Sequence, residues 1–376
     1  MGASYGNAGF IASELIDPLA TPGTIRKAIP MLLDRHGALS IPARNLHRSL
    51  PWMMRFALSA RQKTVEEGRL ALNQLLKNAV HFWRQMLVRE GLGQHLQHSH
   101  YLRVWERAEG KAAALAEQRF YNDWNIEADF LDKDEVADIE PALYPQVSHA
   151  VRLPDAHRVS DPYQISQALF KSFVKRGGQF LAGQVVSLRP GDLKVRLKTA
   201  SSELEFERVV VCAGVHSNSL LQSVGLNTPL MAERGYHLNF PNLHGLISGP
   251  VCSAERNVFL SPLEGGLRIV GFSELGGLDL PANPSRYDTL RHHLSALLPA
   301  SEHKLSTCTE WMGMRPTLPD SLPVIDTHPV YPQIGFAFGH QHAGVTLAAV
   351  TAKLIADRIS GCSDSINLNP YRVDRF

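Results

Sequence analysis

Cysteine is scarce in this sequence and widely scattered. The four cysteines, Cys212, Cys252, Cys308 and Cys362, form no C-x-x-C pair and have no spacing typical of a zinc site. This pattern argues against a small disulfide-stapled module and favours a reducing, cytoplasmic setting. An excess of one charge is lacking too, because 38 basic and 36 acidic residues give a formal net charge of +2 without long blocks of either sign. We therefore expect no nucleic-acid partner, which would require clustered basic residues.

Long apolar runs are also missing. No stretch approaches the roughly 18 to 20 consecutive apolar residues of a spanning helix, and the first residues lack the basic and apolar regions of a signal peptide. Peripheral contact with the inner membrane stays open, with residues 50–58 (LPWMMRFAL) as the candidate segment. The alternative is that this segment is a loop and helix start packed on the core.

The 376 residues are enough for two domains with a sizeable core, and 44% of them are hydrophobic. Apolar residues recur at helical spacing over 66–90, 107–122, 132–139, 162–177, 285–298 and 346–360. Strands are predicted at 101–106, 179–181, 184–188 and 207–214, with a hairpin formed by 193–197 and 202–206. Within 207–214 the apolar run Val-Val-Val predicts a buried parallel strand. This order of elements predicts interleaved α/β and α+β layers.

Arg315 stands in the segment Gly-Met-Arg-Pro-Thr-Leu-Pro-Asp, which cannot form a regular helix. An arginine held rigidly among such residues is suited to bidentate binding of a carboxylate. The alternative is an arginine in a surface salt bridge.

A glycine turn follows about 25 residues later. Gly339 and Gly344 precede the helix predicted from Thr346, so unpaired N–H groups and the positive helix end could bind an anion or the edge of a flavin ring. A plain tight turn is the alternative. His340 and His342 could act as acid/base groups or metal ligands.

No metal site is expected, because no cluster of Asp, Glu or Cys accompanies the histidines of this turn in the sequence. A looser histidine cluster, His95, His98 and His100, is predicted to lie in a solvated loop.

Five segments together resemble the D-amino-acid oxidase (DAO) superfamily of FAD enzymes. The resemblance is to the branch that holds bacterial D-amino-acid dehydrogenases, D-hydroxyproline dehydrogenases and glycine oxidase. The segments are residues 3–9, 161–185, 209–221, 233–237 and 313–361. The resemblance implies a discontinuous Rossmann-like FAD-binding domain (1–50, 150–225 and 311–376) interleaved with a mixed-sheet substrate domain (51–149 and 226–310).

The resemblance also implies residue roles. Arg315 would clamp the substrate carboxylate, and the segment Glu233 to His237, with Tyr236 and His237 as candidate site residues, would border the substrate pocket. The residues expected to contact FAD are Ala3, Ser4, Ala8, Gly9, Phe10, Val185, Ala213, Gly214, Gly339, His340, Gln341, His342, Ala343, Gly344, Val345 and Thr346.

The implied reaction is hydride transfer from the α-carbon of a D-amino acid or small cyclic imino acid to flavin N5. The cofactor supplies the chemistry, and the protein orients the substrate. The electron acceptor stays open between oxygen, a quinone and a partner flavoprotein.

One departure from the family pattern matters. Family members begin with a strand, a G-x-G-x-x-G turn and a helix, whereas this chain contains no G-x-G-x-x-G. Three explanations are open: a start assigned too late or a truncated gene, a partner chain that supplies the unit, and a non-catalytic remnant that does not bind FAD. Under each of these explanations, we expect the chain as given to retain FAD weakly.

Overall fold

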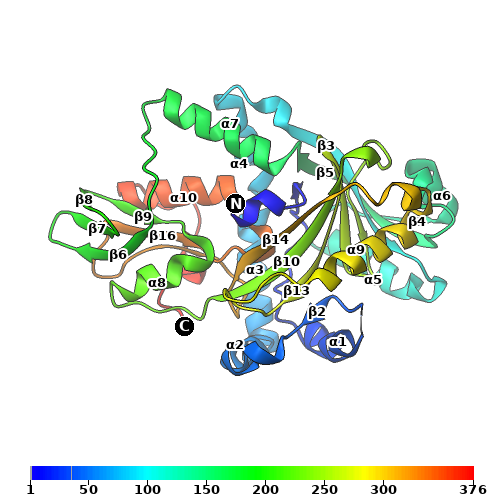
Figure 1. Cartoon of the computed structure of the whole chain (residues 1–376), viewed down its shortest axis with the longest axis horizontal. Coiled ribbons are helices and arrows are strands. Elements are labelled where there is room, and N and C mark those ends of the chain that lie inside the picture. Colours follow the sequence, from blue (N-terminus) through cyan, green and yellow to red (C-terminus); the bar gives the residue numbers. More distant parts are fainter. Residues whose placement is uncertain (1, 35) are drawn as a thin grey trace.

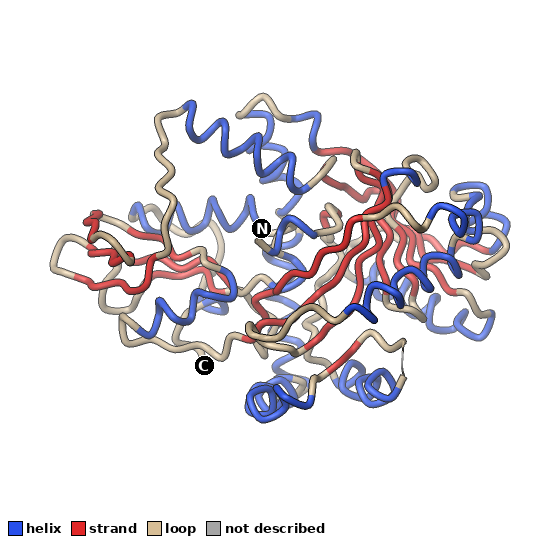
Figure 2. The backbone as a smooth tube through the Cα atoms, viewed as in Figure 1, coloured by secondary structure: helices blue, strands red, loops and turns tan. Residues whose placement is uncertain are grey.

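The computed structural model describes residues 2–34 and 36–376. Its elements form two lobes, which Figure 1 shows as a large curled sheet on the right and a smaller group of strands and helices on the left. The chain crosses between the lobes more than once, so each lobe combines segments that are distant in sequence (Figure 2). This mixed architecture confirms the predicted fold class.

The large sheet has ten strands. They are β1 (Phe10–Ile11), β2 (Leu39–Ser40), β3 (Leu96–Trp105), β4 (Asp129–Asp132), β5 (His149–Val159), β10 (Met231–Phe240), β11 (Val251–Ser253), β12 (Val258–Leu263), β13 (Gly266–Glu274) and β14 (Thr309–Thr317). The main path runs β1-β5-β3-β11-β12-β13-β10-β14, with β2 beside β13 and β4 beside β5. Most neighbours are antiparallel, but β3 and β11 are parallel, as are β2 and β13.

Helices cover this sheet. α9 (Pro284–Leu297) begins at the cap Asn283, whose side chain accepts a hydrogen bond from the N–H of Ser285 at 3.2 Å. Its leucines, including Leu290 and Leu294, are fully buried in the largest core cluster. α5 (Lys111–Asp123) and α6 (Lys133–Ile139) lie near the far end of the sheet in Figure 1.

The second lobe contains two small sheets. β9 (Val209–Val211), β15 (Val324–Thr327) and β16 (Ile334–Phe338) form one in the order β15-β16-β9, with β9 parallel to β16. β6 (Val185–Pro190), β7 (Val195–Thr199) and β8 (Glu203–Phe206) form an antiparallel second sheet. α10 (Ala348–Ser360) packs on this lobe and ends at Gly361, where φ is 76°. α8 (Ser217–Gln222) completes the lobe.

Three further helices lie between the lobes in Figure 1. They are α3 (Gln62–Leu76), α4 (Ala79–Arg89) and α7 (Pro162–Lys175). Trp83 of α4 packs in one cluster with Ala349 of α10, and the Trp83 indole N–H donates to the carbonyl of Val345 at 3.0 Å. α4 thereby supports the turn that precedes α10.

Most predicted elements are confirmed. Helices at 107–122, 132–139, 162–177, 285–298 and 346–360 correspond to α5, α6, α7, α9 and α10, and the hairpin corresponds to β7 and β8. Asp132 caps α6 in a capping box with Glu135. The domain boundaries stay a prediction. Residues 150–159 and 311–317, which were assigned to the FAD-binding domain, lie on β5 and β14 of the large sheet.

Four expectations need correction. Residues 66–90 form two helices rather than one, with a break at residues 77–78, and residues 179–181 are irregular rather than a strand. The histidine cluster does not lie in a solvated loop, because His98 and His100 stand on β3 and His100 contacts the buried Glu140 at 3.0 Å. β9 is parallel as predicted but not fully buried. Val210 is 37% exposed because β9 is the edge strand of its sheet.

Residues 50–58 lie on α2 (Leu46–Ser59), which follows α1 (Pro22–Leu33). The prediction of packing on the core holds for Trp52, which is 8% exposed. Leu50, Met54 and Leu58 instead face solvent. Within the two described ranges, no helix is long and apolar enough to cross a bilayer.

Candidate functional site

One face of the β10–β14 pair gathers the polar residues of interest. The antiparallel register places Glu233 opposite Arg315, Gly235 opposite Gly313 and His237 opposite Trp311. Because side chains alternate along a strand, these three pairs share one face of the sheet. Strand pairing therefore brings Arg315 beside a segment 80 residues earlier in the chain, as its 3.1 Å contact with Glu233 shows.

Glu233 is the centre of this face. One carboxylate oxygen, Oε1, accepts from Arg315 Nη1 at 3.1 Å, from Ser273 Oγ at 2.6 Å and contacts His342 Nε2 at 2.8 Å. The other oxygen accepts from Thr317 Oγ1 at 2.9 Å. The side chain is only 5% exposed, so a buried carboxylate is held by four side chains from two strands, β13 and β14, and one turn.

These contacts keep Glu233 ionised. Burial alone would raise the pKa of Glu233, but the attraction of His342 and Arg315 and the hydrogen bonds from His342 and Ser273 outweigh it. The pKa of Glu233 consequently lies well below its ordinary value. The site thus carries a fixed negative charge next to the guanidinium of Arg315.

Arg315 uses only part of its hydrogen-bonding capacity on the protein. Nη1 donates to Glu233 and, at 2.8 Å, to the carbonyl of Phe272, a residue in the left-handed region with φ 71°. Nε and Nη2 donate to no other residue in the described part of the chain. The Arg315 side chain is 19% exposed, so these nitrogens remain available to a carboxylate.

Gly235 makes room for this guanidinium. A Cβ at position 235 would lie 2.2 Å from Arg315 Nη2 and 2.4 Å from Cζ. Every larger residue would therefore push the guanidinium away from its partners. Glycine is required at Gly235 by this close approach and not by backbone conformation.

Gly235→Ala is expected to raise KM for the amino-acid substrate at least several-fold, because the methyl group displaces Arg315 from the Glu233 contact. Gly183→Ala is the matched control, since nothing lies within 4 Å of a Cβ at Gly183. Steady-state KM values for the two variants would check this. Equal KM values would show that the guanidinium position does not matter for binding.

The N-terminal 3-10 helix η1 (Ala3–Gly6) covers the other end of the same face. Cβ atoms at Gly6 and Gly313 would lie 2.0 and 1.8 Å from the Trp311 ring, so both glycines allow the indole to lie flat between them. His237 stacks on Trp311 with ring centroids 5.1 Å apart, and its Nδ1 lies 3.2 Å from the carbonyl oxygen of Gly6. Burial, with Arg268 nearby, lowers the pKa of His237 to about 3, so the imidazole is neutral.

Tyr236 lies on the opposite face of β10. It is fully buried in the large core cluster, where its hydroxyl donates to Glu274 at 3.0 Å and accepts from the N–H of Asn283 at 3.1 Å. The predicted pocket-bordering role of Tyr236 and His237 stays a prediction. The structure places only His237 on the face that contains Arg315.

The turn at 339–346 joins β16 to α10. Gly339 has φ 81°, and Gln341 has φ 49°, a conformation that costs energy for a residue with a side chain. The N–H groups of Gly344, Val345 and Thr346 donate to no acceptor among the residues the structure describes. Free donors at the positive end of α10 fit an anionic or electron-rich cofactor edge.

Side chains of this turn anchor it to the protein. Thr346 Oγ1 accepts from the N–H of Ala12 at 3.0 Å, and His340 Nε2 lies 2.9 Å from Thr351 Oγ1. Burial lowers the pKa of His340 to about 4, so this ring is neutral. Val345 is buried against Ile11 and Trp83. Toward a cofactor, these residues can offer mainly their backbone groups.

The N-terminal segment is anchored in a similar way. Phe10 is buried and stacks on Tyr101 with centroids 4.8 Å apart, while Gly9 has φ 72° and donates to Asn7 Oδ1 at 2.8 Å. Arg268 donates to the carbonyl of Asn7 at 2.7 Å. Ala3 and Ser4, in η1, are exposed.

Val185, Ala213 and Gly214 lie in the second lobe. Val185 and Ala213 border one core cluster there, and Gly214, with φ 55°, opens the 3-10 helix η6 (Gly214–His216), which contacts β14. All three stay predicted cofactor contacts. The structure thus brings the turn at 339–346, η1 and Arg315 together, and places Val185 on a separate hairpin.

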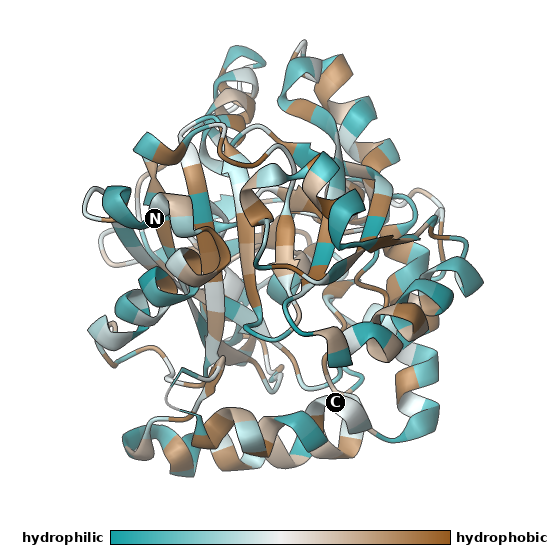
Figure 3. Ribbon diagram, turned by 90° about the vertical axis from the view of Figure 1, so that its right-hand side faces the viewer, coloured by the Kyte–Doolittle hydropathy of each residue, from teal (hydrophilic) through white to brown (hydrophobic). Residues whose placement is uncertain are grey.

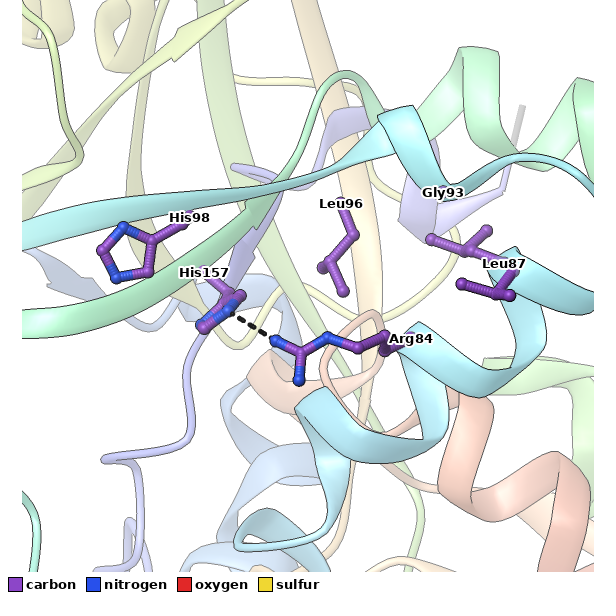
Figure 4. Close-up of a pocket in the computed structure, with 7 residues that line it drawn as sticks. Arg84, Leu87, Gly93, Leu96, His98 and His157 are labelled. Atoms are coloured by element: carbon purple, nitrogen blue, oxygen red, sulfur yellow. Dashed lines mark hydrogen bonds between the residues drawn. The ribbon is translucent and has the colours of Figure 1, made fainter.

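Two cavities lie elsewhere. One, of about 170 Å³, is shown in Figure 4, where Arg84 Nη2 approaches His157 Nε2 at 3.3 Å. The other, of about 360 Å³, is lined by residues that include His36, Glu106 and His293. Neither cavity is lined by Arg315 or by the turn before α10. Among the described residues, no group of three or more His, Cys, Asp or Glu could hold a metal ion.

Glu233 is the residue of the candidate site that sequence reasoning did not single out. It was predicted only to border a pocket, together with its neighbours. A rigidly held arginine that becomes buried needs a counter-charge, and this requirement was the available signal. The identity of the partner required the β10–β14 register.

Comparison with known proteins identifies the family. The profile of the DAO family, described as FAD dependent oxidoreductase, matches residues 1–358. The chain is 31% identical over 386 residues to a protein named D-amino-acid oxidase from Bradyrhizobium diazoefficiens, across 100% of this chain and 90% of the relative. The chain belongs to the DAO family of FAD-dependent oxidoreductases.

Solved structures agree on the fold. Glycine oxidase from Geobacillus kaustophilus superposes with a TM-score of 0.75 at 21% identity, covering 81% of this chain and 83% of that one. Iminodiacetate oxidase from Chelativorans sp. BNC1 superposes with a TM-score of 0.71 at 17% identity, covering 99% and 89%. The chain has the fold of these two enzymes, and as a member of the DAO family it includes a Rossmann-like FAD-binding domain.

Proposed function

We propose that this chain is an FAD-dependent dehydrogenase or oxidase of a D-amino acid or a small cyclic imino acid. One observation carries the proposal: Glu233 Oε1 contacts both Arg315, at 3.1 Å, and His342, at 2.8 Å. The arginine suited to a substrate carboxylate and the turn suited to a flavin therefore meet at one buried atom. The name of the Bradyrhizobium relative, D-amino-acid oxidase, supports the same substrate class.

Each residue has a defined task in this proposal. The free nitrogens of Arg315 bind the substrate carboxylate, while Glu233 holds the guanidinium in position. The N–H groups of Gly344, Val345 and Thr346 would hold the flavin edge. Trp311 and η1, which contacts β14, would shield this face from water. When bound, FAD supplies the hydride acceptor for the α-carbon hydrogen.

The test is flavin reduction by substrate. With FAD in large excess, because the chain as given is expected to retain it weakly, the flavin absorbance is expected to bleach on anaerobic addition of a D-amino acid, glycine, sarcosine, iminodiacetate or D-hydroxyproline. The L-enantiomers of the chiral members of this panel serve as controls. A protein that binds FAD but is reduced by no member of this panel would contradict the proposed substrate class. A protein that binds no FAD even when the cofactor is in large excess would contradict the proposed enzyme.

A second measurement addresses the electron acceptor, which we leave open between oxygen, a quinone and a partner flavoprotein. The panel member that bleaches the flavin would be tested for oxygen consumption and for reduction of a soluble quinone analogue. The faster reaction identifies the acceptor class.

A further inference from the structure

The first two helices, α1 and α2, present apolar side chains to solvent. Ile29 and Leu33 of α1 are 66% and 83% exposed, and α1 contains no buried residue. On α2, Leu50, Met54 and Leu58 are 51%, 61% and 54% exposed. Both helices lie at the lower edge of the molecule in Figure 1 and again in Figure 3, where brown apolar bands alternate with teal.

The exposed apolar residues of α2 form one stripe. Leu46, Leu50, Met54 and Leu58 are four residues apart, which spreads them over only about 120° of a helix that turns about 100° per residue. Trp52, Phe56 and Ser49 lie on the other side of the helix and face the protein. The stripe therefore points away from the core.

Basic side chains flank these apolar residues. α1 contains Arg26 and Lys27, and α2 contains Arg48 and Arg55, all exposed, whereas neither helix contains an acidic residue. The acidic groups close by are Asp34, just after α1, and Asp279, which pairs with Arg48 at 3.0 Å. The charge on this surface is thus predominantly positive.

We propose that α1 and α2 form a docking surface for an anionic lipid bilayer. Exposed apolar side chains flanked by arginine and lysine on helices without acidic residues match a helix that lies in the plane of the membrane interface. The apolar residues enter the acyl boundary, and the basic residues bind lipid phosphates at the anionic surface. This surface is distinct from the Glu233 site, and the proposal does not depend on the proposed reaction.

The test uses the full chain in a vesicle flotation assay. Wild-type protein is expected to float with vesicles of phosphatidylcholine and phosphatidylglycerol, to float much less with phosphatidylcholine alone, and to be released by high salt. The double variant Leu50→Ser, Met54→Ser is expected to reduce partition to anionic vesicles at least tenfold. The charge variant Arg26→Gln, Arg55→Gln should weaken binding to anionic vesicles without changing binding to neutral ones.

The matched control is Leu70→Ser, Val88→Ser, which removes two apolar side chains that are 62% and 66% exposed on α3 and α4. It should float like the wild type. Circular dichroism and thermal melts would establish that all variants fold. Two results would overturn the proposal: wild-type protein that stays in solution with anionic vesicles, or a Leu50/Met54 variant that floats as well as the wild type. Light scattering that shows this variant abolishing a dimer while lipid binding persists would also overturn it, in favour of a second copy as the occupant.

Discussion

Arg315→Lys is expected to raise KM for the amino-acid substrate at least about tenfold, with a smaller change in kcat. Lysine places a point charge where arginine places a planar fork, so it cannot contact Glu233, the Phe272 carbonyl and a substrate carboxylate together. A hydrogen bond to a charged group contributes about 1.5 to 3 kcal/mol, and about 1.4 kcal/mol corresponds to a tenfold change in affinity. Because the contact exists in both the ground state and the transition state, its loss should appear mainly in KM.

Arg196→Lys provides the control, since Arg196 is half-exposed on β7 and pairs with Glu205 at 3.1 Å. This variant should keep the wild-type KM. If Arg315→Lys also keeps it, Arg315 does not bind the substrate, and the alternative reading of a salt-bridge arginine would be the correct one.

Glu233→Gln is expected to destabilise the protein by roughly 3 to 5 kcal/mol near neutral pH, because it leaves Arg315 without its buried counter-charge. Urea unfolding monitored by fluorescence would measure the loss. Glu205→Gln is the control, as Glu205 is exposed, and a surface ion pair contributes at most about 1 kcal/mol. A loss no greater than that of the control would mean that the Glu233 cluster does not stabilise the fold.

The same variant should change the pH dependence of stability. The folded pKa of Glu233 is lowered, so the unfolded state binds more protons and stability rises with pH. The contribution of Glu233 is complete above its unfolded pKa, about 4.3, and is lost as the pH falls toward the lower folded value. Wild-type protein should therefore lose more stability than Glu233→Gln between about pH 5 and about pH 3. Parallel pH profiles for the two proteins would contradict this assignment.

Local sequence signals predicted those parts of the molecule in which the decisive interactions are short-range. Asp132 caps α6 as expected, because the capping contacts lie within three residues. Gly361 ends α10 because the left-handed conformation at that residue favours glycine. The break at residues 77–78 was missed because apolar spacing continues through it. The 179–181 segment was misassigned because its residue types suit a strand, but no neighbouring strand pairs with it.

By itself, the sequence determined the family resemblance, the class of fold and the two segments around Arg315 and Gly344, since each depends on residue types at fixed spacing. Tertiary structure alone decided which residues of those segments meet. The register of β10 with β14 selected Glu233 as the partner of Arg315 and left Tyr236 on the opposite face. The packing of α2 on the protein also decided that Leu50, Met54 and Leu58 face solvent while Trp52 does not. The reason is that register and burial arise from contacts between residues far apart in the chain, which local spacing does not encode.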